Sequence, residues 1–163
     1  MKLALITGAT KGIGRSTAQT FAKAGWNLIL LARDIQKLQD LKNELSNNGV
    51  QINISAFDLS KADKIDQYLN QCIKSYGCPT VVINNAGFAF NGELVSMPLE
   101  KWQEIIQVNL TSVFQICSCI VPFMRIKGGL IINVSSHAAN NAFPQWGAYC
   151  VSKAALALSL IHI

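Results

Sequence analysis

The chain has 163 residues, of which 50% are hydrophobic and 14% are Asp, Glu, Lys or Arg, and its formal net charge is +5. This composition excludes a disordered chain and predicts a single domain over residues 1–163 with a sizeable core. The basic residues are scattered and the apolar runs are shorter than the roughly 20 residues of a membrane span. We therefore expect neither a nucleic acid nor a membrane as partner.

The chain contains five cysteines, an odd number, and no CxxC pair with a histidine nearby. A disulfide framework or a cysteine-based metal site would need paired or clustered residues. The sequence therefore predicts reduced core thiols in a cytoplasmic protein and no metal site.

Apolar strand-like runs alternate with segments of helical periodicity along the whole chain. The expected strands are 3–7, 28–32, 52–57, 80–84 and 130–134. The expected helices are 13–24, a segment through Leu38, Leu41 and Leu45, 61–76, most of 99–124, and Trp146 to the C-terminus. This order predicts an α/β fold with a parallel sheet covered on both faces. Ligands of such sheets bind beyond the carboxyl ends of the strands.

A glycine-rich turn, TGATKGIG at residues 7–14, follows the first expected strand and leads into a helix. Gly8, Gly12 and Gly14 allow a tight turn and a close approach of the backbone to a phosphate, at the positive end of the helix dipole. The turn is not a Walker A loop, because no Gly-Lys-Ser/Thr closes it, and its G-x3-G-x-G spacing differs from GxGxxG. It predicts a dinucleotide site.

Five motifs in order resemble those of the short-chain dehydrogenase/reductase family, and together they cover residues 1–158. TGATKGIG is similar to the family's TGxxxGxG, and 84–87 to its NNAG. Asn109 in VNLTSVF and Ser136 in LIINVSSHAA match its helix asparagine and its catalytic serine, and 149–153 matches YxxSK. The resemblance implies a Rossmann-type doubly wound parallel sheet and an NADP-dependent oxidoreductase. The implied substrate is a small carbonyl compound or alcohol, with 3-oxoacyl thioesters and general ketones both open.

Tyr149 and Lys153 are four residues apart, so a helix places both on one face. A nearby ammonium favours the phenolate form of a tyrosine, which makes proton exchange with a carbonyl oxygen easier. We therefore expect Tyr149 to act as general acid and base. The resemblance implies that Lys153 also holds the ribose of the nicotinamide.

Ser136 lies thirteen residues before Tyr149, the spacing of the family's catalytic serine, and its neighbour Ser135 should face the other way on a strand. Ser136 would donate a hydrogen bond to the substrate oxygen. By resemblance Asn109 holds a water that relays protons to Lys153, although an asparagine that merely bends a helix is the alternative. His137 lies beside the serine, but the family's mechanism needs no histidine.

The residues after the second strand indicate the coenzyme. NAD enzymes place an acidic residue there, whereas this chain has Ala32 followed by Arg33, with Lys11 in the glycine turn. Both cations suit a 2′-phosphate, which favours NADP over NAD, and Asp34 is expected to cap the next helix. The predicted coenzyme contacts are Gly8, Thr10, Lys11, Gly12, Ile13, Gly14, Arg33, Asp58, Leu59, Asn85, Ala86, Gly87, Tyr149 and Lys153.

The resemblance ends inside or just after the Tyr149 helix, because members of the family continue with a sixth strand, a Pro-Gly loop, a substrate lid and a seventh strand. We therefore expect a C-terminally truncated chain. The alternative to an active oxidoreductase is a non-catalytic fragment that binds NADP. The segment 108–124 and the Tyr149 helix are apolar on more than one side. The matching helices of the family pair across a two-fold axis, so the resemblance implies a homo-oligomer at full length.

Overall fold

A computed structural model describes residues 2–159 and shows a five-stranded parallel sheet with the strand order β3-β2-β1-β4-β5. The strands are β1 (Leu3–Thr7), β2 (Asn27–Ala32), β3 (Ile52–Ala56), β4 (Val81–Asn84) and β5 (Leu130–Asn133). The helices are α1 (Gly12–Lys23), α2 (Ile35–Leu45), α3 (Ala62–Tyr76), α4 (Leu99–Ile106), α5 (Ser112–Lys127) and α6 (Gly147–Ser159). The predicted elements and the doubly wound arrangement are confirmed. The predicted continuation of the last helix to Ile163 lies outside the described residues.

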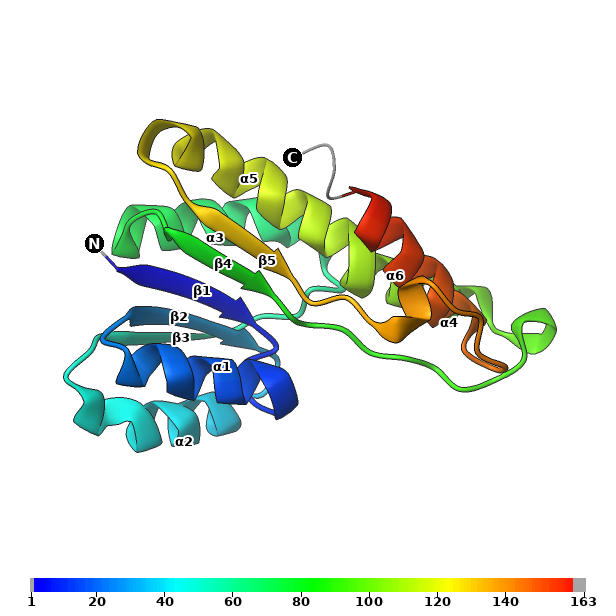
Figure 1. The fold of residues 1–163 in the computed structure, drawn as a ribbon, viewed down its shortest axis with the longest axis horizontal. Coiled ribbons are helices and arrows are strands. Elements are labelled where there is room, and N and C mark those ends of the chain that lie inside the picture. Colours follow the sequence, from blue (N-terminus) through cyan, green and yellow to red (C-terminus); the bar gives the residue numbers. More distant parts are fainter. Residues whose placement is uncertain (1, 160–163) are drawn as a thin grey trace.

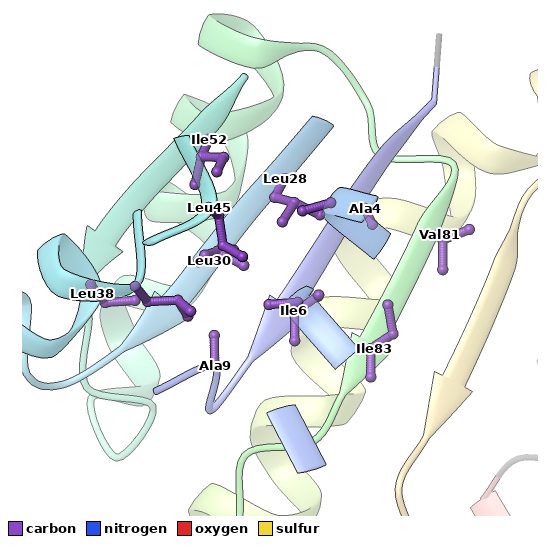
Figure 2. Packing of buried hydrophobic residues seen from close by; sticks show 13 residues of the cluster. Ala4, Ile6, Ala9, Leu28, Leu30, Leu38, Leu45, Ile52, Val81 and Ile83 are labelled. Carbon is purple, nitrogen blue, oxygen red and sulfur yellow. The ribbon is translucent and has the colours of Figure 1, made fainter. Parts of the chain in front are cut away.

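Alternate side chains of the central strands are buried on opposite faces, as the two-residue period of a strand requires. Ala4, Ile6 and Leu28 pack with α1 and α2 on one face, where Figure 2 shows this cluster from close by. Leu3 and Leu5 pack with α3 and α5 on the other face. Figure 1 shows the two helix layers on either side of the sheet, with α4 and α6 beyond the carboxyl ends of the strands.

The edge strand β5 is only partly buried. Ile131 packs with the α3–α5 layer, but Leu130 and Ile132, on the opposite face, are 54% and 39% exposed. The helices on that face, α1 and α2, pack mainly against β1, β2 and β3. One face of β5 is therefore bare within the described part of the chain.

The predicted helix over 99–124 is interrupted by a π-helical turn, Gln107–Thr111, between α4 and α5. Such turns insert one extra residue into a helix and are frequent at functional sites. The whole segment Leu99–Lys127 is long and apolar enough to cross a membrane by length and composition alone. In this fold, however, Ile116, Ile120 and Met124 are buried against the sheet, as in a core helix.

Candidate functional site

The turn between β1 and α1 is built so that only glycine fits at its key positions. Gly8 and Gly12 adopt positive φ angles of 65° and 50°, which L side chains rarely adopt. A Cβ atom added to Gly14 would come nearer than 3.0 Å to the Gly8 carbonyl oxygen and to Nδ2 of Asn85. Gly14, in the first turn of α1, therefore lets the helix pack directly on the glycine turn.

Buried hydrogen bonds join the glycine turn to the loop after β4. Thr7 Oγ1 accepts hydrogen bonds from the backbone N–H groups of Asn85 (3.0 Å) and Ala86 (2.9 Å). Asn85 Nδ2 in turn donates to the carbonyl oxygens of Thr7 (3.0 Å) and Gly8 (3.2 Å). Asn85 thus holds the turn in place. Sequence reasoning did not assign a role to Thr7, although a polar residue at the end of a buried strand was a usable signal.

A cavity of about 320 Å³ lies where the loops after β1, β2, β3 and β4 meet. The predicted coenzyme residues among its lining are Gly8, Thr10, Lys11, Arg33, Asp58, Leu59, Ala86 and Gly87. Lining residues that the sequence analysis did not assign to the coenzyme are Leu31, Ala32, Asp34, Lys37, Phe57, Phe88 and Val108. Gly12, Ile13, Gly14, Asn85, Tyr149 and Lys153 are not among the lining residues, and Ile13 is 62% exposed.

The charge at one end of the cavity is positive. Asp34 caps α2 by accepting a hydrogen bond from the backbone N–H of Lys37 (3.1 Å), as predicted, and its carboxylate also pairs with Nζ of Lys37 (3.1 Å). The hydrogen bond from that backbone N–H is the main cause that lowers the pKa of Asp34. Within residues 2–159 neither Lys11 nor Arg33 forms an ion pair. Two uncompensated cations beside a glycine turn fit a phosphorylated nucleotide.

Asp58 has a local structural role as well as a place in the cavity. Its Oδ1 accepts a hydrogen bond from the backbone N–H of Ser60 (3.0 Å), which shapes the turn that leads into α3. Phe57 stacks on Tyr68 with ring centroids 4.6 Å apart, so the apolar wall of the cavity rests on α3. The arrangement of these residues is compatible with the predicted dinucleotide site.

Tyr149 and Lys153 lie next to each other on α6, with Nζ of Lys153 5.8 Å from the centroid of the Tyr149 ring. Lys153 is only 4% exposed, and its Nζ donates a hydrogen bond to the carbonyl oxygen of Val134 (2.7 Å) at the end of β5. Burial lowers the pKa of Lys153 from its ordinary value of 10.5. A buried ammonium costs free energy, so its position beside a tyrosine makes Lys153 a candidate functional residue.

The buried Lys153 gives the fold a pH dependence with a definite sign. Because its folded-state pKa is lowered, the unfolded chain binds more protons between that pKa and 10.5, and the free energy of unfolding rises with pH there. We expect wild type to gain stability relative to Lys153→Met between pH 7 and pH 10 in urea unfolding. The other titrating groups are common to both chains, and a constant difference between them would contradict the expectation.

Asn109 is completely buried in the π-helical turn and connects the loop after β4 to α6. Its Oδ1 accepts from the Phe88 N–H (3.0 Å), and its Nδ2 donates to the Phe88 carbonyl oxygen (2.9 Å) and to Ser152 Oγ (3.1 Å). Ser152 Oγ donates to the Tyr149 carbonyl oxygen (2.8 Å). Asn109 Oδ1 and Lys153 Nζ lie 3.1 and 3.7 Å from the position of a Cβ atom built on Gly87. Both predicted residues therefore lie close to Gly87, which lines the cavity.

Ser136 precedes a short 3-10 turn, His137–Ala139, that packs against α6. Its Oγ accepts a hydrogen bond from the Ala138 N–H (3.1 Å), which leaves its hydroxyl proton available. Ser136 is half-buried whereas Ser135 is exposed. The exposed His137 is within hydrogen-bond distance of Asn141 through its ring Nε2 (3.2 Å) and its carbonyl oxygen (3.1 Å). The described residues contain no group of three His, Cys, Asp or Glu side chains placed to hold a metal ion.

Comparison with known proteins agrees with this arrangement. The family model described as short chain dehydrogenase matches residues 2–160. A 3-oxoacyl-(acyl-carrier-protein) reductase of Thermotoga maritima is 35% identical over 156 residues, which are 94% of this chain and 63% of that protein. The chain thus spans less than two thirds of the length of this curated relative.

Two solved structures are similar over 99% of this chain. One is an alcohol dehydrogenase from the archaeon Thermococcus sibiricus complexed with 5-hydroxy-NADP (TM-score 0.94, 30% identity, 69% of that chain). The other is a metagenomic short-chain oxidoreductase in complex with NADP (TM-score 0.94, 32% identity, 74% of that chain). Because the family model matches almost every residue and the sheet, the glycine turn and the Tyr149–Lys153 pair have the arrangement expected of it, the chain belongs to the short-chain dehydrogenase family.

Proposed function

We propose that the chain carries the coenzyme and proton-transfer machinery of an NADP-dependent oxidoreductase that interconverts a carbonyl compound and an alcohol. The observation that carries the proposal is the buried Lys153 ammonium beside the Tyr149 ring, next to a cavity with two unpaired cations. The nicotinamide, when bound, supplies or accepts the hydride. The NADP complexes of the two similar structures support the same coenzyme.

In this proposal each residue of the site has a separate task. Tyr149 donates its hydroxyl proton to the carbonyl oxygen, or accepts it in the reverse direction. The Lys153 ammonium favours the phenolate that remains. Ser136 donates a hydrogen bond to the same oxygen. Asn109 fixes the loop after β4 and the start of α6 relative to each other through Phe88 and Ser152.

The direct test is a titration of the chain with NADPH, followed by an assay of NADPH oxidation with a panel of ketones. We expect saturable binding of NADPH and turnover of at least one ketone. Binding without turnover would support the alternative of a non-catalytic NADP-binding chain. Absence of NADPH binding by a folded chain would contradict the proposal.

We propose that Arg33 causes the chain to bind NADPH more tightly than NADH. Arg33→Asp removes a cation from the cavity and adds a hydrogen-bond acceptor for a ribose 2′-hydroxyl. A charge-assisted hydrogen bond contributes about 1.5–3 kcal/mol, so the affinity for NADPH should fall roughly tenfold to over a hundredfold. The affinity for NADH should stay the same or rise, as measured by fluorescence titration with both coenzymes.

The matched control is Arg125→Asp, which makes the same change in net charge at an exposed position in the last turn of α5. It should leave the ratio of the two affinities unchanged, because Arg125 does not line the cavity. An equal loss of NADPH affinity in both variants would mean that net charge, rather than a contact with the 2′-phosphate, is responsible.

We also propose that the full-length protein is a homo-oligomer. Large apolar side chains remain exposed on α5 and α6, among them Phe114 (67%), Phe123 (41%), Val151 (45%) and Leu158 (74%). Exposed apolar surface of this kind favours association. Light scattering at micromolar concentration should give a dimer or tetramer, and a monodisperse monomer would contradict the proposal.

A further inference from the structure

A row of aromatic side chains reaches Tyr149 from the segment before α6, whereas Lys153 follows Tyr149 one turn later along the helix. The ring of Trp146 meets that of Tyr149 edge to face, with centroids 5.7 Å apart at 87°. Phe143 follows at 5.8 Å from Trp146, and His137 at 6.0 Å from Phe143. We call Phe143 and Trp146 the aromatic row. Lys153 lies against Tyr149 and next to Gly87 of the cavity wall, so Tyr149 links the coenzyme cavity to the aromatic row.

The backbone holds the aromatic row in place. The Trp146 N–H donates to the Phe143 carbonyl oxygen (3.1 Å), and the Gly92 N–H donates to the Gln145 carbonyl oxygen (3.0 Å). Gln145, directly before Trp146, has a φ angle of 65°, a conformation that costs free energy in a residue other than glycine. Such strain clusters at ligand-binding positions. Gln145 lies two residues before the start of α6 at Gly147.

The aromatic row is accessible and uncharged. Phe143 and Trp146 are each 38% exposed. No Asp, Glu, Lys or Arg occurs between Lys127 and Lys153. A charged substrate group would therefore find no partner on this segment. An aromatic ring, in contrast, gains contact energy beyond its buried area by packing against other rings.

We propose that the aromatic row binds an aromatic group attached to the substrate carbonyl, so that the substrates are aryl ketones and the corresponding alcohols. The proposal rests on the proposed function, because Tyr149 fixes where the carbonyl oxygen lies. Because Trp146 is in edge-to-face contact with Tyr149 and both rings of the row are partly exposed, the aromatic row is an apolar surface beside a carbonyl oxygen held at the Tyr149 hydroxyl. Phe143 and Trp146 are then residues that determine specificity.

The test compares acetophenone with cyclohexyl methyl ketone, which is similar in size but saturated. Binding is read from the indole N–H signal of Trp146 in a nuclear magnetic resonance titration of the chain with NADP⁺ present, because the oxidised coenzyme cannot reduce the ketone during the measurement. That signal is identified by its loss in Trp146→Leu. We expect acetophenone to shift the signal and to bind roughly two- to tenfold more tightly than cyclohexyl methyl ketone, the range that an aromatic contact contributes.

Phe143→Leu should reduce this preference toward one, while Phe123→Leu should leave it unchanged. Phe123 is the matched control, because it is similarly exposed, at 41%, but lies on α5 and makes no ring contact with the aromatic row. Equal affinities for the two ketones, or equal effects of the two variants, would overturn the proposal. Because Trp146 reports binding without turnover, a failure of coenzyme binding or catalysis is seen separately and contradicts only the proposed function.

Discussion

Replacing Tyr149 with phenylalanine is expected to lower turnover of a ketone by about 10²–10⁴-fold, the usual contribution of a positioned general acid. The substitution removes only the hydroxyl group. The ring keeps its contacts with Trp146 (5.7 Å) and with Lys153 Nζ (5.8 Å), so the site should remain assembled. The dissociation constant of NADPH should therefore change little. Steady-state kinetics and a coenzyme titration on the same preparation measure both effects.

The control for this loss is Tyr76→Phe, which removes the same hydroxyl group at the end of α3, where Tyr76 is 39% exposed. It should leave turnover and NADPH binding unchanged. If Tyr149→Phe retained most of the activity, another group would have to donate the proton, and Ser136 would be the first to examine. Loss of NADPH binding together with turnover would instead indicate that Tyr149 mainly holds the coenzyme.

Replacing Gly14 with alanine should be among the most destabilising small changes in this chain. The added methyl group would lie nearer than 3.0 Å to the Gly8 carbonyl oxygen and to Asn85 Nδ2. Neither can move easily, because Asn85 is tied to the Thr7 and Gly8 carbonyl oxygens. Overpacking of this kind costs about 1–3 kcal/mol, which exceeds the roughly 0.5–1 kcal/mol that alanine gains over glycine inside a helix. Urea unfolding should show the net loss, and NADPH affinity should fall as the turn shifts.

Gly129→Ala provides a matched comparison, because its added methyl group would also lie within 3.0 Å of another atom. The atoms in its way, however, belong to the flexible side chain of Met124, which can change rotamer. We expect a small change in the free energy of unfolding and none in NADPH affinity. Equal effects of the two substitutions would show that the rigidity of the glycine turn is not the cause.

The elements of the fold and the residue types of the candidate site could be predicted from local sequence patterns. Buried parallel strands are apolar throughout, so β1, β2 and β4 were recognisable as short apolar runs. The positive φ angles of Gly8 and Gly12 and the close approach of Gly14 to the Gly8 carbonyl oxygen act within a few residues of the turn after β1. The helical spacing of Tyr149 and Lys153 places the two side chains together without any information about the rest of the chain. Each of these features depends on local geometry.

The contacts between residues far apart in the sequence could not be predicted and are seen only in the folded chain. Thr7 contacts Asn85 because β1 and β4 are neighbours in the sheet, although 78 residues separate them. Asn109 reaches Ser152 across 43 residues, and this contact depends on the extra residue of the π-helical turn. The lining of the cavity by Lys37 and Phe57 follows from the meeting of four loops. Such contacts leave no periodic signal in the sequence, because they are set by strand order and by packing between layers rather than by the spacing of residues along one element.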